Sequence, residues 1–328
     1  MGRRIIYMGT PEFACPALRM LAEQSDVEIA LVVTQPDRAA GRGRKMQAPP
    51  VKHLAESLRV PVYQTASLRT AEQRRPLVEI QPDLIVVAAF GLILGTSILE
   101  LPPRGCVNLH ASILPRYRGA SPISAAILKG DPETGVTLMR MERGLDTGPM
   151  LDTACLVIAT DDTTASLTGR LSDVAGELLL MNLDDLLTGS IPQVAQPSGA
   201  SVTRSLVKAD GWIDWTRPRE ETERHVRAMW SWPRAWTTLP NGSAFQIHLA
   251  RTDDKAGPAV PGTASINDEA LRVRCSDGWI SVERGQLAGG KSLMGSQLVS
   301  MTQFAGGPVL GGQAGPDEPG PMVRAVAE

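Results

Sequence analysis

The chain has 328 residues, a length that accommodates two domains. Hydrophobic residues make up 43% of the chain and charged residues 21%, a globular balance that excludes disorder throughout. The 33 Lys and Arg residues and 35 Asp and Glu residues give a net charge of −2, so any surface that binds nucleic acid must be local.

The first half of the chain alternates strand patterns with helical patterns. Continuous apolar runs such as residues 84–89 are typical of strands that are buried on both faces. The alternation predicts an α/β fold over residues 1–188, with a doubly wound, mostly parallel sheet. The predicted strands are 3–8, 27–34, 83–90, 105–110, 134–141 and 150–157; the predicted helices are 11–23, with Thr10 as its N-cap, 51–58, 71–80, 122–128 and 164–187.

The sequence changes in character after residue 188. Residues 189–207 are rich in Pro, Gly, Ser and Gln, which predicts a linker. Residues 208–305 carry short strand patterns at 245–250, 271–275 and 279–283 and one helical pattern at 219–229, which predict a small β-barrel or sandwich. Residues 306–328 are rich in Gly and Pro and predict a disordered tail.

The four cysteines and four histidines show no spacing of a disulfide framework or a metal site, which favours a reducing compartment. The longest apolar run, 84–94, is shorter than the roughly 20 residues that span a bilayer. The N-terminus enters a strand pattern directly and shows no signal peptide. We therefore expect a cytoplasmic protein without a metal or a membrane anchor.

Residues 105–148 carry the strongest chemical signal. Asn108 and His110 stand two apart at the end of a predicted strand, so their side chains share a face, at the edge where open α/β sheets bind ligands. A second loop, 143–148, brings Asp146 to His110 if both loops lie at that edge. A carboxylate holds an imidazole in one tautomer and an Asn amide donates to an oxyanion, which suits acyl transfer. Taken alone, His110 is more typical of a histidine that ends a strand, and Asn108 and Asp146 are typical of turns.

Residues 108–123 read Asn-Leu-His-Ala-Ser-Ile-Leu-Pro-Arg-Tyr-Arg-Gly-Ala-Ser-Pro-Ile and, with Asp146, resemble the motif of the folate-dependent formyltransferases. Residues 9–13, 34–45 and 208–215 resemble the branch of that family that formylates methionyl-tRNA. The resemblance covers residues 3–305. It implies a Rossmann-like catalytic domain followed by an open, OB-like β-barrel that contacts tRNA.

The resemblance also implies the reaction and its residues. The chain would act as a monomer and transfer a formyl group from 10-formyltetrahydrofolate to the α-amino group of initiator methionyl-tRNA, for translation initiation. The implied catalytic residues are Asn108, His110 and Asp146; the implied folate-binding residues are Phe90, Gly91, Ser112, Ile113, Leu114 and Pro115; the implied tRNA contacts are Arg38, Arg42, Arg44, Lys45 and Lys291.

The basic loop also indicates a phosphate surface without the resemblance. Arg38, Arg42, Arg44 and Lys45 fall within eight residues, spaced by two glycines, in a chain of nearly zero net charge. The alternative is a solvated charged loop. We expect the loop beside the tRNA acceptor end, with Arg42 as the leading contact.

Three alternative functions remain open at this point. Residues 285–292 match the nucleotide-binding pattern G-x-x-x-x-G-K-[ST], but only 36 residues follow Ser292, too few for an NTPase sheet. A formyltransferase acting on an amino-sugar nucleotide would share the Asn-x-His motif and the distant Asp. A non-catalytic RNA-binding protein on the same fold would show a degraded motif, whereas all three residues are present here.

Overall fold

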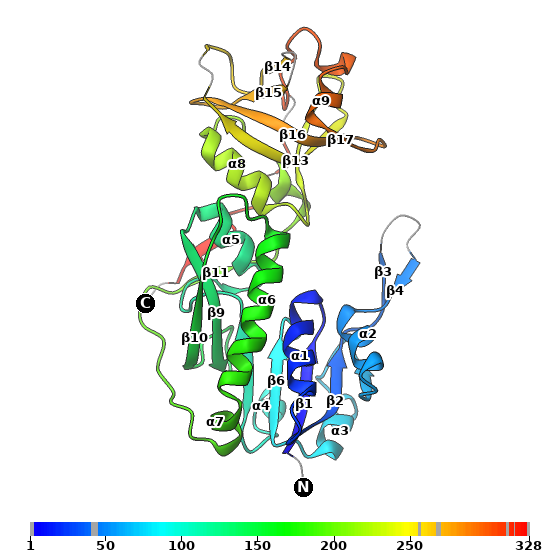
Figure 1. Ribbon diagram of the computed structural model, residues 1–328, viewed down its shortest axis with the longest axis vertical. Helices are drawn as coiled ribbons and strands as arrows, with labels where there is room; N and C mark the ends of the chain where they lie inside the picture. Colours follow the sequence, from blue (N-terminus) through cyan, green and yellow to red (C-terminus); the bar gives the residue numbers. More distant parts are fainter. Residues whose placement is uncertain are drawn as a thin grey trace.

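Two successive parts of the chain, each built on its own sheet, make up the computed structural model (Figure 1). The structure describes residues 3–40, 45–254, 257–266, 270–312, 315–317 and 319–326. Arg42 and Arg44, two of the predicted tRNA contacts, lie outside these residues. No helix in the described ranges is both long and apolar enough to cross a membrane.

The N-terminal part contains a seven-stranded sheet in the order β10-β9-β7-β6-β1-β2-β5. The five strands from β7 to β5 are parallel, β9 is antiparallel to β7, and β10 is antiparallel to β9. The predicted mostly parallel sheet is therefore confirmed. The strands are β1 (Arg3–Gly9), β2 (Val27–Thr34), β5 (Val62–Gln64), β6 (Leu84–Ala88), β7 (Cys106–His110), β9 (Glu133–Arg140) and β10 (Met150–Val157).

Helices cover both faces of this sheet, because successive residues of each buried strand point to opposite sides. Ile5 and Val107 pack in the core that includes α1 and α6, whereas Ile6 and Cys106 pack with residues of α3 and α4 on the other face. The helices are α1 (Cys15–Ala22), α2 (Pro50–Ser57), α3 (Ala71–Ile80), α4 (Thr96–Leu99), α5 (Pro122–Lys129), α6 (Thr164–Met181) and α7 (Leu183–Thr188).

Two predicted helices differ from the observed ones. The first begins with a 3₁₀ turn, η1 (Glu12–Ala14), and Thr10 does not cap it. The Thr10 hydroxyl donates instead to the carbonyl of Phe90, 3.1 Å away, which ties the loops after β1 and β6 together. The predicted helix 164–187 is interrupted at Asn182, which ends α6 and precedes α7.

The C-terminal part is an antiparallel β domain, ordered β12-β13-β16-β15-β14 with β17 paired to β16. Phe245 and Phe304 meet edge to face in its core, and α8 packs on β13 and β16. The elements are α8 (Arg219–Ala228), β12 (Ala235–Thr238), β13 (Ala244–Asp253), β14 (Ala264–Ile266), β15 (Leu271–Arg274), β16 (Trp279–Leu287), β17 (Ser292–Met294), α9 (Gly295–Leu298) and the 3₁₀ turns η2 (Lys208–Gly211) and η3 (Thr302–Phe304).

A small third sheet, in the order β18-β11-β8, joins distant segments of the chain. β11 (Ser201–Thr203) lies in the predicted linker and runs parallel to β8 (Arg118–Gly119), so this stretch of the linker belongs to the N-terminal part. β18 (Val323–Ala325) lies in the predicted tail and pairs antiparallel with β11. The expectation of a disordered tail is wrong for these residues, because the open edge of β11 supplies backbone partners and Met322 is buried.

A fourth, two-stranded sheet is the hairpin of β3 (Arg38–Ala40) and β4 (Lys45–Gln47). Figure 1 shows it projecting beyond the end of the parallel sheet toward which β6 points, the side on which the C-terminal part also lies. The two parts are joined through α8. Arg227 donates to the carbonyl of Asp162, 2.9 Å away, and Thr164 donates to the carbonyl of Ala228, 2.6 Å away.

Candidate active site

The end of β7 places Asn108 and His110 on one face of the sheet, as their spacing predicted. Asn108 lies beside Val87 of β6 and opposite Met139 of β9, and His110 lies opposite Thr137 of β9. Both side chains are largely buried, with 9% and 5% of their surfaces exposed. Two polar side chains therefore lie in a mostly apolar sheet at its carboxyl edge, where ligands bind in open α/β folds.

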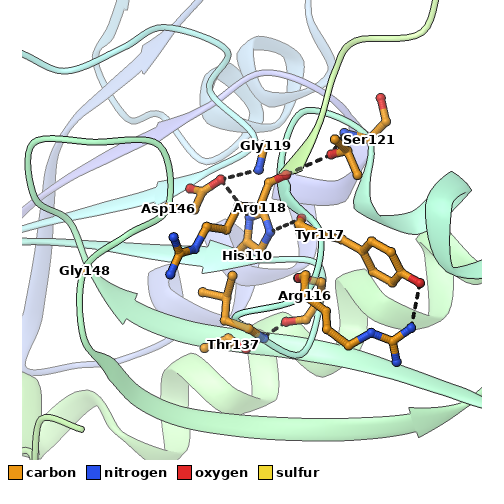
Figure 2. Close-up of polar contacts among 12 residues, drawn as sticks. His110, Arg116, Tyr117, Arg118, Gly119, Ser121, Thr137, Asp146 and Gly148 are labelled. Atoms are coloured by element: carbon orange, nitrogen blue, oxygen red, sulfur yellow. Dashed lines mark hydrogen bonds and ion pairs between the residues drawn. The ribbon is translucent and has the colours of Figure 1, made fainter. Parts of the chain in front are cut away.

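Asp146 meets His110 at this edge, which confirms the predicted juxtaposition (Figure 2). The Asp146 Oδ2 atom lies 3.6 Å from His110 Nδ1. The other ring nitrogen, Nε2, donates to the backbone carbonyl of Tyr117, 2.9 Å away. A carbonyl oxygen only accepts, so Nε2 carries a hydrogen. The Asp146 carboxylate faces the other ring nitrogen, Nδ1, at a distance longer than a hydrogen bond.

The Asp146 carboxylate is itself held by β8. Its Oδ2 atom accepts a hydrogen bond from the Gly119 amide, 2.7 Å away. Gly119 has a φ of 97°, and a Cβ there would overlap the carbonyl oxygen of Thr203 in β11. Only glycine permits this approach, so the small β8–β11 sheet sets the position of the amide that orients the carboxylate.

Residues 112–117 form a loop that is hydrogen-bonded to Thr137 of β9. The Thr137 hydroxyl donates to the Ser112 carbonyl, 2.7 Å away, and accepts from the Leu114 amide, 3.1 Å away. The Ser112 hydroxyl donates to the carbonyl of Arg116. Among the four predicted folate residues of this loop, Ser112, Leu114 and Pro115 are buried and only Ile113 is partly exposed. The buried side chains shape the loop rather than present their surfaces to solvent.

The two other predicted folate residues lie in the loop after β6. The Phe90 carbonyl accepts from the side-chain amide of Gln35, 2.8 Å away, as well as from Thr10. Gly91 has a φ of 78°, and a Cβ there would overlap the Gln35 amide. Because β6 neighbours β7, this loop borders the edge that carries Asn108 and His110.

Tyr117 is packed against a charged pair at the side of the loop. Its hydroxyl donates to Asp131, 2.6 Å away, and Arg116 bridges the same carboxylate at 2.7 Å. Burial, together with the neighbouring Asp131 carboxylate, raises the pKa of the Tyr117 hydroxyl well above its usual range. The phenol therefore stays protonated and keeps the Tyr117 carbonyl in place for His110.

Hydrogen bonds fix the residues from which the basic hairpin extends. Arg38 donates to Gln35, and Lys52 pairs with Asp37 at 3.0 Å. Hydrogen bonds from Gln64 and Lys52 lower the pKa of the Asp37 carboxyl. Lys45, at the start of β4, is exposed. Arg38 and Lys45 thus lie on a hairpin anchored beside Gln35, which also holds Phe90.

Lys291 is exposed in the turn between β16 and β17, on the C-terminal part. This turn carries the nucleotide-binding pattern of residues 285–292, and the structure argues against that interpretation. Gly285 lies inside β16 and Ser292 begins the antiparallel strand β17, so the segment is a β-hairpin rather than a strand leading into a helix.

Comparison with protein families follows the two structural parts. A model described as "Formyl transferase" matches residues 3–183, and one described as "Formyl transferase, C-terminal domain" matches residues 205–302. The chain belongs to the formyl transferase family. The first match contains the loops of Asn108, His110 and Asp146, and the second ends before β18.

Relatives within this family match over nearly the whole chain. A protein named methionyl-tRNA formyltransferase from Trichlorobacter lovleyi is 44% identical over 311 residues, which cover 94% of this chain and 97% of the relative. A protein of the same name from Ectopseudomonas mendocina is 45% identical over 312 residues, which cover 94% of this chain and 98% of the relative.

Solved structures share the fold at lower identity. WlaRD, a sugar 3N-formyl transferase, matches with a TM-score of 0.65 and 18% identity, over 89% of this chain and 99% of that chain. HypX from Aquifex aeolicus in complex with tetrahydrofolic acid matches with a TM-score of 0.61 and 17% identity, over 93% of this chain and 48% of that chain. This formyl transferase therefore spans about half the length of HypX.

The structure adds residues to the site of this formyl transferase that the sequence did not indicate. Thr137 holds the loop of residues 112–117, and Gln196 of the predicted linker bonds to the Asp146 turn. Both side chains act through hydrogen bonds to backbone carbonyls, and such bonds leave no trace in the composition or the hydrophobic periodicity of the sequence. Within the described ranges, no cluster of three or more His, Cys, Asp or Glu residues could hold a metal ion.

Proposed function

We propose that this formyl transferase acts as a monomer in the cytoplasm and transfers the formyl group of 10-formyltetrahydrofolate to the α-amino group of initiator methionyl-tRNA, for translation initiation. The meeting of Asn108, His110 and Asp146 at the carboxyl edge of the sheet carries the proposal. Relatives named methionyl-tRNA formyltransferase, matched over 94% of the chain, support the choice of acceptor.

The reaction needs one attack, one collapse and one proton transfer. The neutral amine forms a bond to the formyl carbon, and the carbonyl π electrons move to the oxygen. The oxyanion then collapses, the bond from carbon to N10 of the folate breaks, and N10 takes up the proton that the amine loses. A free α-amino group has a pKa of about 7.7–8.0, so a useful fraction is neutral near physiological pH.

Asn108 and His110 supply the polar groups for this path. The Asn108 amide is the proposed donor to the oxyanion, because Asn108 lies two positions before His110 on the same face and is only slightly exposed. The pair of His110 and Asp146 is the proposed carrier of the amine proton, with His110 assisting the oxyanion when protonated. Burial strengthens these interactions, because little water competes for them.

The two substrates approach the edge from different sides in this proposal. The loop of Phe90 and Gly91 and the exposed part of Ile113 border the folate position. A WlaRD structure determined in the presence of 5-N-formyl-THF supports a folate co-substrate on this fold. The exposed cations Arg38, Lys45 and Lys291 contact the tRNA backbone in this proposal. Arg42 and Arg44, which lie outside the described residues, are proposed as further tRNA contacts from the sequence.

The test is transfer of a radiolabelled formyl group from 10-formyltetrahydrofolate to four acceptors: charged initiator tRNA, charged elongator tRNA, free methionine and an amino-sugar nucleotide. We expect formylation of the charged initiator tRNA and loss of this activity in His110→Ala. Efficient transfer to the amino-sugar nucleotide alone would overturn the proposed acceptor. Binding of tRNA without any transfer would indicate a non-catalytic RNA-binding protein.

A further inference from the structure

Gln196 lies in the segment between the two family matches and joins the two loops of the candidate site. Its side-chain Nε2 donates to the backbone carbonyls of Asp146 and Gly148, each 2.8 Å away. Its Oε1 accepts from Arg118 Nε at 3.0 Å and from Arg118 Nη2 at 2.7 Å. One side chain from the linker thus bonds to both the β8 loop and the Asp146 turn.

The amide of Gln196 is fully used by these contacts. A glutamine amide offers two hydrogens and two acceptor lone pairs, and each of the four has a partner here. Such complete pairing across two loops leaves the side chain one arrangement. Linker residues whose only role is to connect domains have no need of it.

The backbone of Asp146 requires support of this kind. Asp146 has a φ of 53°, in the left-handed region that non-glycine residues seldom adopt. Such a conformation is strained and persists where the surroundings hold it. Two contacts do so: the Gly119 amide binds the carboxylate and Gln196 binds the carbonyl of the same residue.

We propose that Gln196 is a positioning residue for the transfer reaction: it holds the Asp146 turn in the conformation that aims the carboxylate at His110. The inference rests on the proposed function, in which Asp146 and His110 carry the proton. Gln196, Arg118, Gly119 and Asp146 form a closed circuit of hydrogen bonds, because Arg118 and Gly119 are consecutive in β8. Figure 2 shows the part of it between Gly119 and Asp146. Opening the circuit at Gln196 frees the Asp146 turn.

The first experiment compares Gln196→Leu and Gln196→Glu with Gln193→Leu. Gln193 lies three residues earlier in the same segment, is exposed, and makes no side-chain hydrogen bond in the described part of the chain. Leucine removes all four bonds, whereas glutamate keeps the acceptor for Arg118 and loses both donors to the turn. We expect kcat to fall about 10- to 100-fold in both Gln196 variants, the cost of an ångström-scale misplacement. KM for 10-formyltetrahydrofolate and the melting temperature change little, and Gln193→Leu matches wild type.

Wild-type kcat in Gln196→Glu would overturn the inference, because that variant lacks the two donors that hold the turn. Loss of kcat together with a lower melting temperature and a weakened folate KM would also overturn it, since that result describes general damage rather than positioning.

The second experiment tests whether Gln196 acts through Asp146. In a double-mutant cycle, Gln196→Leu should lower kcat much less in an Asp146→Asn background than in wild type. An equal fold-loss in both backgrounds would overturn the inference. If Asp146→Asn retains full activity, the proposed role of Asp146 fails and the inference with it. Absence of formyl transfer to charged tRNA by the wild type would instead overturn the proposed function, so the two failures are distinguishable.

The third measurement does not depend on turnover. The Gly119 amide reports directly on the Asp146 carboxylate, to which it donates. Its proton resonance should move upfield in Gln196→Leu, as the hydrogen bond lengthens, and stay in place in Gln193→Leu. An unmoved Gly119 resonance in Gln196→Leu would show that the turn does not depend on Gln196.

Discussion

The carboxylate of Asp146 approaches the imidazole of His110 across two loops, with 3.6 Å between Oδ2 and Nδ1. The separation exceeds that of a normal N–H···O hydrogen bond, whereas the Gly119 amide lies 2.7 Å from the same oxygen. The carboxylate is therefore anchored by backbone and faces the ring without being bonded to it. This arrangement leaves Oδ2 available to a proton that arrives with the substrate.

The charge of Asp146 is the first feature to test. Asp146→Asn keeps the size of the side chain and an oxygen for the Gly119 amide, but it removes the negative charge beside His110. We expect turnover to fall about 100-fold or more, the scale for losing one group that stabilises a transition state. Folate affinity, measured by titration, should change by less than about threefold. Turnover within a few-fold of wild type would exclude Asp146 from the chemistry.

Asn108 and His110 can be tested separately, because each has its own proposed role. Asn108→Ala and His110→Ala should each lower turnover at least about a hundredfold, since each removes a donor used in the transition state. Both side chains are buried, so circular dichroism and folate titration must show that the variants remain folded. A folded Asn108→Ala variant with nearly normal turnover would remove the proposed oxyanion donor.

The basic hairpin should act on the tRNA alone. Lys45→Ala combined with Arg42→Ala should lower kcat/KM for charged tRNA at least about tenfold and flatten its dependence on salt, because fewer phosphate contacts release fewer counterions. Arg75→Ala is the control, since Arg75 is a largely exposed cation on α3, outside the hairpin. A loss of folate affinity with unchanged tRNA kinetics would place the hairpin at the other substrate.

The sequence predicted those parts of the fold that depend on local patterns. Strand patterns predicted β2 and β10 with the observed ends, and the spacing of two residues placed Asn108 and His110 on one face. The meeting of Asp146 with His110 followed from the rule that parallel strands end at one edge. The catalytic roles, and the folate and tRNA contacts, stay predictions.

The remaining features depend on pairings between distant segments. Gln196 bonds to Asp146, which lies 50 residues away, and β11 pairs with β8 and β18 through backbone groups. A three-residue strand has no measurable period, and Gly and Pro around residues 306–320 resemble a tail with no partner. The strand that pairs with β18 is β11, which lies in the segment predicted to be a linker. Such edge pairings cannot be read from one segment at a time.

The pairing of β18 can be tested by ending the chain at Gly312. In the intact protein the Arg204 amide donates to the Met322 carbonyl, whereas the Ser201 amide donates to the Pro115 carbonyl on the other side of β11. Truncation should therefore speed hydrogen exchange at the Arg204 amide at least about tenfold and leave the Ser201 amide protected. Equal exchange at Arg204 in both proteins would mean that β18 does not pair with β11 in solution.

The last prediction concerns the ion pair of Arg204 and Asp210, which lies where the C-terminal part begins. Arg204 binds both carboxylate oxygens, at 2.6 and 2.7 Å, and the Val207 amide adds a third hydrogen bond. Burial raises the pKa of the Asp210 carboxyl, but the bonds from Arg204 and Val207 outweigh it, so the pKa lies below its ordinary value. A carboxyl with a lowered folded-state pKa stabilises the fold above its unfolded pKa of about 3.9 and loses that contribution as the pH falls through the folded value.

Arg204→Gln should therefore lower the free energy of unfolding at pH 7 by about 1–2 kcal/mol, allowing for solvent screening of the exposed part of Arg204. The difference from wild type should narrow as the pH falls below about 4, the ordinary pKa that Asp210 has in the unfolded chain, and through the lower pKa that Asp210 has in the folded protein. The contact of Arg204 with the Gly320 carbonyl does not titrate, so the pH-dependent part of the difference isolates Asp210. Arg217→Gln is the control, because its pair with Asp214 is largely exposed and should contribute little. Denaturant unfolding across this pH range measures both variants, and a difference for Arg204→Gln that stays constant with pH would contradict the role of the Asp210 charge.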